Sequence, residues 1–322
     1  MTSPSQHAPQ RPNGDARRAA WPELPPLADW QDTVETLHMW TQIVGKVRLE
    51  QAPWINHSWG SALYVTTRGL TTSPIPYDAR TFALDFDFVG HTLRITTSAG
   101  EERAFDLAPM SVADFYQKTM RALGELDIEV EILARPVEVP DPIEPFPEDE
   151  THASYDADAV RRYWRALVQV DRVFRAFRAR FTGKASPVHF FWGAFDLAVT
   201  RFSGRPAPTH PGGVPNCADW VMEEAYSREL SSAGFWPGTG LGEAAFYSYA
   251  YPEPGGFREH DVQPAAAYYL DEMGEFVLPY AAVRAADDPD GVLLAFLQDT
   301  YEAAADLADW DRALLEGEAT PA

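Results

Sequence analysis

The segment 188–205 carries the densest group of side chains that could perform chemistry. Four of them occupy odd-numbered positions: His189, Arg201, Ser203 and Arg205. Because side chains alternate between the two faces of a strand, we expect these four on one face. An imidazole beside guanidinium groups could act as a general base next to a bound carboxylate or phosphate. The pattern predicts His189 and Ser203 as catalytic residues, and Arg201 and Arg205 as ligand-binding residues.

Arg201 also has a structural interpretation, which the sequence leaves open. Pairing with Asp196 or Glu224 would neutralise its charge and tie two parts of the chain together. Arg68 occupies the matching position in an earlier segment of similar sequence, so Arg68 and Arg201 could converge about a pseudo-twofold axis. We therefore predict that Arg68 binds the same ligand, although structural symmetry alone would explain the pair equally well.

The segment 206–242 is rich in proline and glycine and has no counterpart of similar length earlier in the chain. Its acids, hydroxyls and aromatic residues precede a Pro-Gly pair, so it could form a lid over a binding site. A packed loop is the simpler interpretation. We predict Glu224 as a catalytic residue, and Tyr226 and Trp236 as contacts of the ligand.

Three tyrosines, Tyr247, Tyr249 and Tyr251, alternate along a predicted strand. Aromatic stripes of this kind line small-molecule clefts, and they also simply cover the face of a sheet. Cover is the favoured interpretation, and Tyr249 is the member predicted to contact a ligand.

A polar stripe at helical spacing lies in the first predicted helix and comprises His38, Gln42 and Lys46. We expect it to be a solvated face of that helix. The motifs GxxxxGK[ST], HExxH, CxxC and GxSxG are absent from the sequence. No histidines have the spacing of a local metal site, so no metal is predicted and the cofactor is unknown.

Recurring sequence anchors predict an internal duplication. Each recurs in the same order in the two halves of the chain. The matching pairs are Trp59 and Trp192, Arg68 and Arg201, Phe105 and Phe276, and Phe115 and Phe296.

Hydrophobic periodicity assigns each half a helix, four strands and a second helix. Helices are expected near 29–50, 115–126, 158–181 and 291–307. Strands are expected near 59–68, 82–88, 92–97, 103–107, 128–132, 188–202, 246–251, 266–270 and 276–278. We predict an α+β fold in which two such units pair edge to edge into a largely antiparallel sheet with helices on one face.

The same analysis divides the chain into five parts. They are a disordered tail at 1–20, a first repeat at 21–135, a connector rich in proline and acids at 136–157, a second repeat at 158–316, and an insertion at 206–242 within that repeat. A stiff connector between two copies is expected from its proline content.

The composition limits the partners. The 322 residues include 48 acidic and 26 basic residues, which gives a formal net charge of −22. Such a charge repels nucleic acids and anionic membranes, so neither is an expected partner. A single cysteine, Cys217, rules out an internal disulfide and is typical of a cytoplasmic protein. No apolar run approaches the ~20 residues of a membrane helix.

Five segments carry a resemblance to a known family. They are residues 37–48, 63–76, 189–205, 224–238 and 245–254. Together they resemble the DUF5996 family, a group of uncharacterised bacterial proteins. The resemblance spans nearly the whole chain after Trp21 and implies a bacterial origin, but it implies no reaction, substrate or cofactor.

Two functions are compatible with these residues. The first is an enzyme acting on a small anionic molecule, a carboxylate or a phosphate, with His189 as base and Arg201 and Arg205 holding the anion. The second is a non-catalytic small-molecule-binding or scaffold protein that uses its aromatic stripe as the contact surface. Nothing in the sequence decides the oligomeric state.

Overall fold

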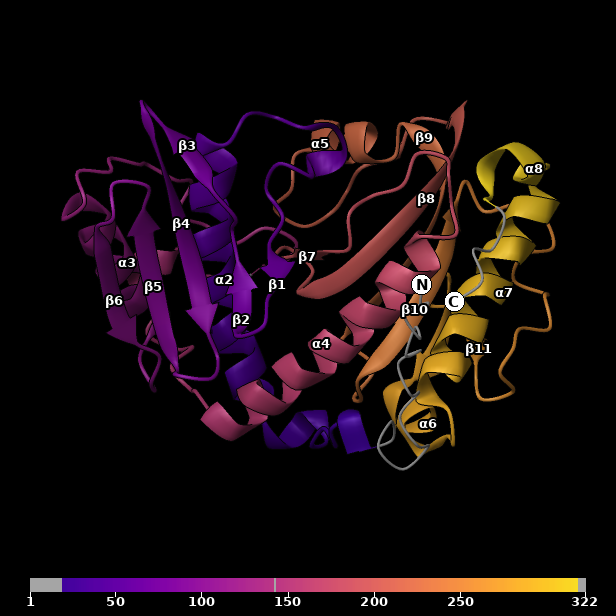
Figure 1. Cartoon of the computed structure of the whole chain (residues 1–322), viewed down its shortest axis with the longest axis horizontal. Helices are drawn as coiled ribbons and strands as arrows, with labels where there is room; N and C mark the ends of the chain where they lie inside the picture. The colour runs from indigo at the N-terminus through magenta and orange to yellow at the C-terminus, as the bar shows by residue number, and fades with distance from the viewer. Residues whose placement is uncertain (1–18, 142, 318–322) are drawn as a thin grey trace, which may run out of the picture.

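The computed structural model describes residues 19–141 and 143–317, and these residues form two antiparallel sheets with helices packed against them (Figure 1). The predicted α+β class is confirmed. The sheets occupy opposite sides of the molecule, and one long helix, α4 (Ala157–Arg178), runs diagonally across their junction. None of the described helices is long and apolar enough to span a membrane.

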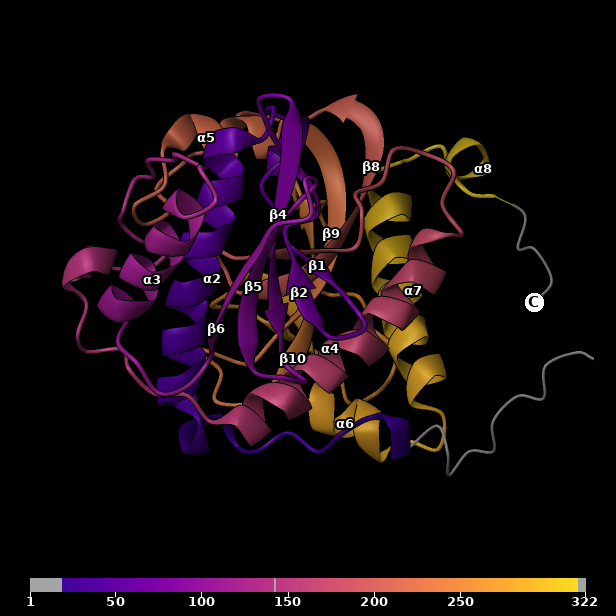
Figure 2. The same ribbon diagram turned by 60° about the vertical axis from the view of Figure 1, so that its left-hand side comes forward.

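The first sheet has the strand order β1-β2-β4-β5-β6, with β3 also paired to β4. Figure 2 shows α2 and α3 together on one side of this sheet. On β4, Phe82, Leu84 and Phe86 are buried while Ala83 and Asp85 are half-buried, as strand alternation predicts. The elements of this half are η1 (Leu27–Asp29), α2 (Gln31–Gln51), η2 (Asn56–Ser58), β1 (Tyr64–Val65), β2 (Gly69–Thr71), β3 (Ile75–Tyr77), β4 (Arg80–Asp87), β5 (Thr92–Thr97), β6 (Glu102–Asp106) and α3 (Val112–Gly124).

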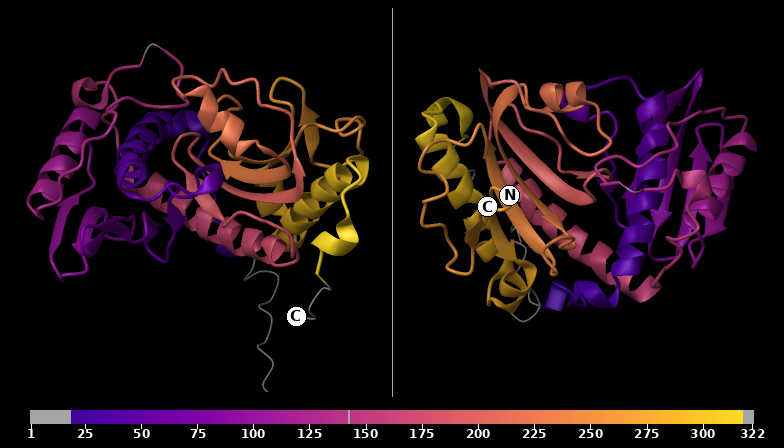
Figure 3. Two further views of the ribbon diagram at one scale, coloured as in Figure 1. Left: turned by 90° about the horizontal axis from the view of Figure 1, so that it is seen from above. Right: turned by 180° about the vertical axis from the view of Figure 1, so that it is seen from behind.

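The second sheet has the order β11-β12-β10-β9-β8-β7. Its elements, with the connector helix η3, are η3 (Phe146–Glu148), β7 (His189–Phe191), β8 (Asp196–Pro206), α5 (Asp219–Ala225), β9 (Arg228–Trp236), β10 (Ala245–Tyr251), β11 (Tyr268–Leu270), β12 (Glu275–Pro279), α6 (Tyr280–Ala285), α7 (Pro289–Leu307) and α8 (Arg312–Leu315). Helices α4 and α7 pack on one face of this sheet (Figure 1). No long helix of the described chain packs on the opposite face, which we call the helix-free face (Figure 3, right).

The two sheets meet at a single isolated bridge, so the predicted continuous sheet is wrong. Leu63 and Phe190 exchange two backbone hydrogen bonds, of 2.9 and 2.7 Å, between β1 and β7. Helices then reach across the junction in both directions. The indole of Trp164 on α4 donates to the carbonyl of Thr66 at 3.1 Å, and His38 Nε2 on α2 lies 2.8 Å from the carbonyl of Gly193. Packing between helices and turns therefore unites the halves.

Turns and one unrecognised strand account for the differences from the predicted elements. Of the expected strand at 59–68 only β1 forms, with turns on either side and β2 beginning at Gly69, and the expected strand at 188–202 is broken by a turn into β7 and β8. Residues 128–132 form no strand. The predicted insertion contains β9, which pairs with both β8 and β10 inside the sheet. Residues 207–227 and 237–242 lie outside the sheet, while the buried apolar residues of β9 fill its centre.

The predicted duplication keeps part of its support. Phe105 and Phe276 lie on β6 and β12, the strands that precede the last long helix of each half, and Phe115 and Phe296 lie on α3 and α7. The Trp and Arg anchors occupy different positions, because Trp59 precedes β1 whereas Trp192 follows β7. Leu63 and Phe190, which face each other at the junction, are 127 residues apart in the sequence. Thr66 and Gly193, whose carbonyls each contact a helix side chain across the junction, are separated by the same number of residues. The duplication thus stays a prediction.

Candidate functional site

Arg201 lies in the core and not in a ligand site. Its residue surface is 1% exposed, and its guanidinium carbon lies 3.5 Å from the ring centroid of Phe177, 4.3 Å from that of Tyr301 and 5.1 Å from that of Phe181. Its Nη2 donates to the carbonyl of Phe177. Burial lowers the pKa of Arg201 to about 10. Cation–π contacts hold this charge, so neither the predicted anion nor the alternative partners Asp196 and Glu224 bind it.

His189 is fully buried on β7, 4.2 Å from the ring of Phe191. Both of its ring nitrogens lack a hydrogen-bond partner among the described residues. Burial lowers the pKa of His189 to about 3, so the imidazole is neutral at physiological pH. No recorded contact joins His189 to Arg201, and the role of His189 as a general base stays a prediction.

Ser203 and Arg205 lie near the C-terminal end of β8 and bind neighbouring parts of the fold. Both donate to the carboxylate of Glu229, at 2.9 and 2.8 Å, and Arg205 also donates to the carbonyl of Ala308 at 2.5 Å. That carbonyl is at the C-terminal end of α7, where a cation is favourable. The predicted catalytic and anion-binding roles of this pair have no geometric support, because both groups are engaged within the fold.

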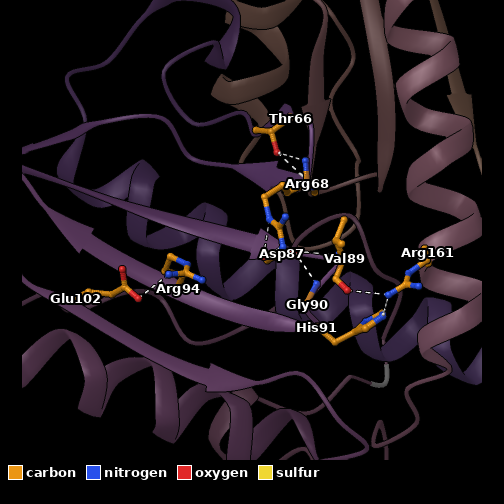
Figure 4. A network of polar contacts seen from close by, with 10 residues as sticks. Thr66, Arg68, Asp87, Val89, Gly90, His91, Arg94, Glu102 and Arg161 are labelled. Atoms are coloured by element: carbon orange, nitrogen blue, oxygen red, sulfur yellow. Dashed lines mark hydrogen bonds and ion pairs between the residues drawn. The ribbon is translucent and has the colours of Figure 1, made fainter.

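Arg68 lies in the turn between β1 and β2 and pairs with Asp87 at 2.7 Å (Figure 4). Asp87 also accepts hydrogen bonds from the backbone of Val89 and Gly90. Burial of the carboxylate by itself would raise the pKa of Asp87. The hydrogen bonds from Gly90, Arg68 and Val89 outweigh burial and lower the pKa. Arg161 of α4 reaches the same turn through the carbonyl of Val89. The network fastens α4 to the first sheet and lies apart from Arg201, so the two arginines do not converge.

Glu224 lies on α5 and holds the segment around His57. Its Oε2 accepts the backbone N–H of His57 at 2.7 Å, and His57 Nδ1 lies 2.8 Å from the carbonyl of Ala225. Lys184 donates to His57 Nε2 at 2.7 Å and lies over the rings of Trp59 and Phe202. Glu224 thus links the two halves through α5 and η2, and it is not close to His189 or Ser203 through any recorded contact.

The helix-free face of the second sheet collects a different set of groups, which we call the acid–tyrosine cluster. Its members come from three strands, from the connector and from the end of α5. They are Asp196, Tyr247, Tyr249, Glu275, Tyr226 and Glu138. Of the predicted site residues, the structure brings Tyr226 and Tyr249 together here, with Trp236 at the side: the Tyr226 and Tyr249 hydroxyls are 2.8 Å apart, and the rings of Trp236 and Tyr247 are 5.8 Å apart.

Asp196 and Tyr247 form the centre of this cluster. The hydroxyl of Tyr247 donates to Asp196 Oδ2, and Asp196 Oδ1 is buried without a partner within the described chain. Tyr247 reaches Asp196 from β10 by lying across Gly234 of β9. A Cβ atom at Gly234 would lie 2.2 Å from the Tyr247 ring. This glycine is therefore required by the close approach of the ring and not by a turn.

Glu138 approaches the cluster from the connector and depends on α2 for its position. Its carboxylate would lie 2.1 Å from a Cβ atom at Gly193, so the missing side chain of that glycine makes room for it. Gln42 of α2 pairs with the backbone of Val137 in both directions, at 2.9 and 2.8 Å. The Gln42 amide therefore satisfies both backbone groups of Val137, as a paired strand would do, and fixes the connector directly before Glu138.

The polar stripe on α2 is consequently not solvated, and that prediction is wrong. Gln42 is fully buried and Lys46 is 3% exposed, while His38 is half-buried. Burial lowers the pKa of Lys46 to about 8 and the pKa of His38 to about 4. The stripe faces the connector and the turn after β7, because α2 lies at the junction and has apolar or structured neighbours on every side.

Burial also perturbs the acids of the cluster. It raises the pKa of Asp196 to about 6, although the Tyr247 hydroxyl opposes the shift. It raises the pKa of Glu138 to about 7 and that of Glu275 to about 8, and in both the negative charge of Asp196 adds to the shift. No described Lys or Arg forms an ion pair with any of the three. These carboxyls thus exchange protons near neutral pH.

The segment 207–227 covers one end of the cluster. His210 lies 4.6 Å from the ring of Tyr226 and 5.5 Å from that of Tyr251, and the Tyr251 hydroxyl donates to the carbonyl of Pro208. Asn216 donates to the carbonyl of Val139 in the connector at 2.9 Å. The segment therefore lies over the helix-free face and contacts the connector, and its interpretation as a lid or as a packed loop stays open.

The donor set does not suit a metal ion. In the portion of the chain that the structure describes, no three His, Cys, Asp or Glu side chains are placed to hold one. The acid–tyrosine cluster itself consists of carboxyls, hydroxyls and aromatic faces.

Residues 21–317 match the model of a family of unknown function, DUF5996. The chain belongs to this family. No curated protein and no solved structure matches the chain. The DUF5996 assignment confirms the resemblance found in the sequence, and the proposals below therefore rest on the site itself.

Sequence reasoning missed Asp196, Tyr247, Glu138 and Glu275 as site residues. Asp196 was considered only as a partner of Arg201, because the opposite face of β8 has the larger number of basic groups. One signal in the sequence could have identified the cluster. Once β9 is recognised as a strand, strand alternation puts four residues on the same face of the sheet: Asp196, Gly234, Tyr247 and Tyr249.

Proposed function

We propose that the acid–tyrosine cluster binds a small organic cation, such as an amine or a guanidinium compound. The observation that supports this most directly is the buried Oδ1 atom of Asp196, which lacks a donor among the described residues. A buried carboxylate oxygen without a partner is costly. A ligand N–H group would supply the missing donor, and its positive charge would offset the mutual repulsion of Asp196, Glu138 and Glu275.

The aromatic members of the cluster suit the same ligand. The rings of Tyr247 and Tyr249 are 6.0 Å apart and those of Tyr226 and Tyr249 are 6.3 Å apart, and each pair is stacked. All three tyrosines are half-buried and keep contact with solvent. The faces of such rings attract ammonium and guanidinium groups by about 0.5–2 kcal/mol. The formal charge of −22 would also favour the approach of a cation.

The anionic ligand expected from the sequence has little support at this face. Arg201 is enclosed by aromatic rings, Arg205 pairs with Glu229, and Arg68 pairs with Asp87. Lys184 lies over the Phe202 ring on this face but already donates to His57 Nε2, whereas Asp196, Glu138 and Glu275 have no ion-pair partner among the described residues. Of the two functions compatible with the sequence, the small-molecule-binding protein is therefore the better supported.

Isothermal titration calorimetry with choline, methylguanidine and putrescine tests this proposal. We expect binding that strengthens from pH 5 to pH 8, because Asp196, Glu138 and Glu275 lose protons over this range, and proton release that depends on the buffer. Asp196→Asn should weaken binding at least tenfold, since a hydrogen bond to a charged group contributes about 1.5–3 kcal/mol.

Asp85→Asn is the matched control, because it changes a half-buried aspartate on the outer face of the first sheet. It should leave amine binding unchanged. Binding of acetate or phosphate in place of the amines, lost on Asp196→Asn, would overturn the proposal.

Acid–base catalysis is a second candidate, favoured by the hydrogen bond between Tyr247 and Asp196. A carboxyl with a pKa of about 6 and one free oxygen can accept or donate a proton near neutral pH. Mass spectrometry of each bound probe after incubation distinguishes the candidates. Chemical conversion that Tyr247→Phe slows without weakening binding would favour the enzyme, whereas unchanged probes favour the binding protein.

A further inference from the structure

A concavity on the other side of the molecule has the opposite charge. It has a volume of about 500 Å³ and is lined by Arg162 and Arg165 of α4, by Arg284 of α6, and by residues 19–23 of the N-terminal segment. We call it the arginine concavity. Glu23 is its only acidic lining residue among those described, so three arginines and one glutamate give a formal charge of +2.

Unpaired arginines are uncommon in this chain. Most of the described arginines pair with a carboxylate or donate to a backbone carbonyl. Within the described residues the exceptions are Arg121, Arg162, Arg165 and Arg180, which have no recorded hydrogen bond or ion pair. Two of the four line the same concavity, in a protein with almost twice as many acidic as basic residues.

The third arginine is also incompletely satisfied. Arg284 Nη2 lies 3.2 Å from Glu23, whose side chain is 78% exposed, while Arg284 Nε is buried and lacks a partner in the described chain. Arg162 and Arg165 lie three residues apart on α4 and so share one side of that helix. Burial raises the pKa of Tyr280, and the charges of Arg284 and Arg165 both oppose this shift, which places both guanidiniums near the same hydroxyl.

We infer that the arginine concavity binds a small molecule carrying a phosphate or diphosphate group. Guanidinium groups present paired N–H donors that match phosphate oxygens. The carboxylate of Glu23 neutralises only one of the three positive charges around the concavity. The volume lies within the range of small-molecule sites and exceeds what a lone phosphate group occupies. The walls belong to α4, α6 and the N-terminal segment, so the site is independent of the acid–tyrosine cluster.

Calorimetric titration of the full chain with pyrophosphate, inorganic phosphate and acetate at low salt tests the inference. Wild-type protein should bind pyrophosphate more tightly than phosphate, and acetate most weakly, with affinity that falls as salt screens the charges. Arg165→Gln should weaken pyrophosphate binding about tenfold or more, and the double change Arg162→Gln with Arg165→Gln should abolish it.

Two controls separate this site from general electrostatics and from the proposed cation site. Arg180→Gln removes an unpaired arginine outside the concavity and should leave pyrophosphate binding within about twofold of wild type. Asp196→Asn should not change it. Equal losses in Arg180→Gln and Arg165→Gln, or a wild-type protein that binds no pyrophosphate, would overturn the inference.

Discussion

The outer face of the first sheet and the helix-free face of the second are both free of long helices in the described chain, yet their charges are arranged differently. On the first sheet, Asp85 on β4 lies opposite Arg94 on β5, and Arg94 pairs with Glu102 on β6 at 2.6 Å. On the second sheet, the Tyr247 hydroxyl is the side-chain partner of Asp196, and no described Lys or Arg forms an ion pair with it.

This difference separates a solvated face from a candidate site. Cross-strand pairs of opposite charge stabilise a sheet that faces water. A face that leaves carboxyls unpaired and covers them with a separate segment gains nothing in stability from them. The second face is therefore the part of the molecule where polar groups are retained at a cost, which is typical of binding sites.

The largest difference in stability is expected between variants of Arg201 and Arg68, the two arginines that occupy matching positions in the sequence. Arg201→Ala should lower the free energy of unfolding by about 3–5 kcal/mol, because it leaves a cavity among three aromatic rings. Arg68→Ala should cost less than about 1 kcal/mol, since its side chain is 58% exposed in its ion pair. Urea denaturation at pH 7 measures both values, and equal losses would contradict the assignment of Arg201 to the core.

The pH dependence of stability should distinguish Asp196 from Asp85. The pKa of Asp196 rises from 3.8 to about 6 on folding, so the native state keeps a proton that the unfolded state has lost. This contribution to stability is present below about pH 4 and is lost as pH rises through 6.

Asp196→Asn should therefore match wild type near pH 4 and exceed it by up to about 3 kcal/mol at pH 8, at about 1.4 kcal/mol per pKa unit. Asp85→Asn should differ from wild type by less than about 1 kcal/mol at both pH values. Denaturant titrations at pH 4, 6 and 8 provide the comparison, and a wild type more stable than Asp196→Asn at pH 8 would refute the explanation.

A smaller effect is expected from one glycine in each half. Gly234→Ala should cost about 1–3 kcal/mol, because its methyl group would displace the Tyr247 ring from Asp196. Gly124→Ala, at the end of α3, meets no atom within 4 Å and should be neutral or stabilising by up to about 1 kcal/mol. Thermal denaturation of both variants decides the matter, and a neutral Gly234→Ala would show that the ring does not need this glycine.

The sequence predicted the local features of the fold well. The long helices α2, α3, α4 and α7 lie within a few residues of their expected positions, because apolar residues at helical spacing and capping residues are local signals. Such a local signal begins α3, where the Ser111 hydroxyl accepts the backbone N–H of Asp114 at 3.1 Å. Alternation along β8 likewise puts Arg201 and Asp196 on opposite faces.

What sequence reasoning did not reach depends on contacts between distant segments. The strand β9 was hidden in a region rich in proline and glycine, and without it the helix-free face could not be assembled. Glu138 joins the cluster only because Gln42, 96 residues earlier, pairs with the neighbouring Val137.

By itself, then, the sequence determined the α+β class, the family, the acidic character and the positions of the main helices. Only the tertiary structure decided which charges are paired. Composition and spacing give the number of acids and arginines on a strand, but the cost of each charge depends on its surroundings in the folded protein. Arg201 is stabilised by aromatic rings from α4 and α7, whereas Asp196 forms no ion pair with a described Lys or Arg, since the Lys184 ammonium over Phe202 bonds to His57 instead.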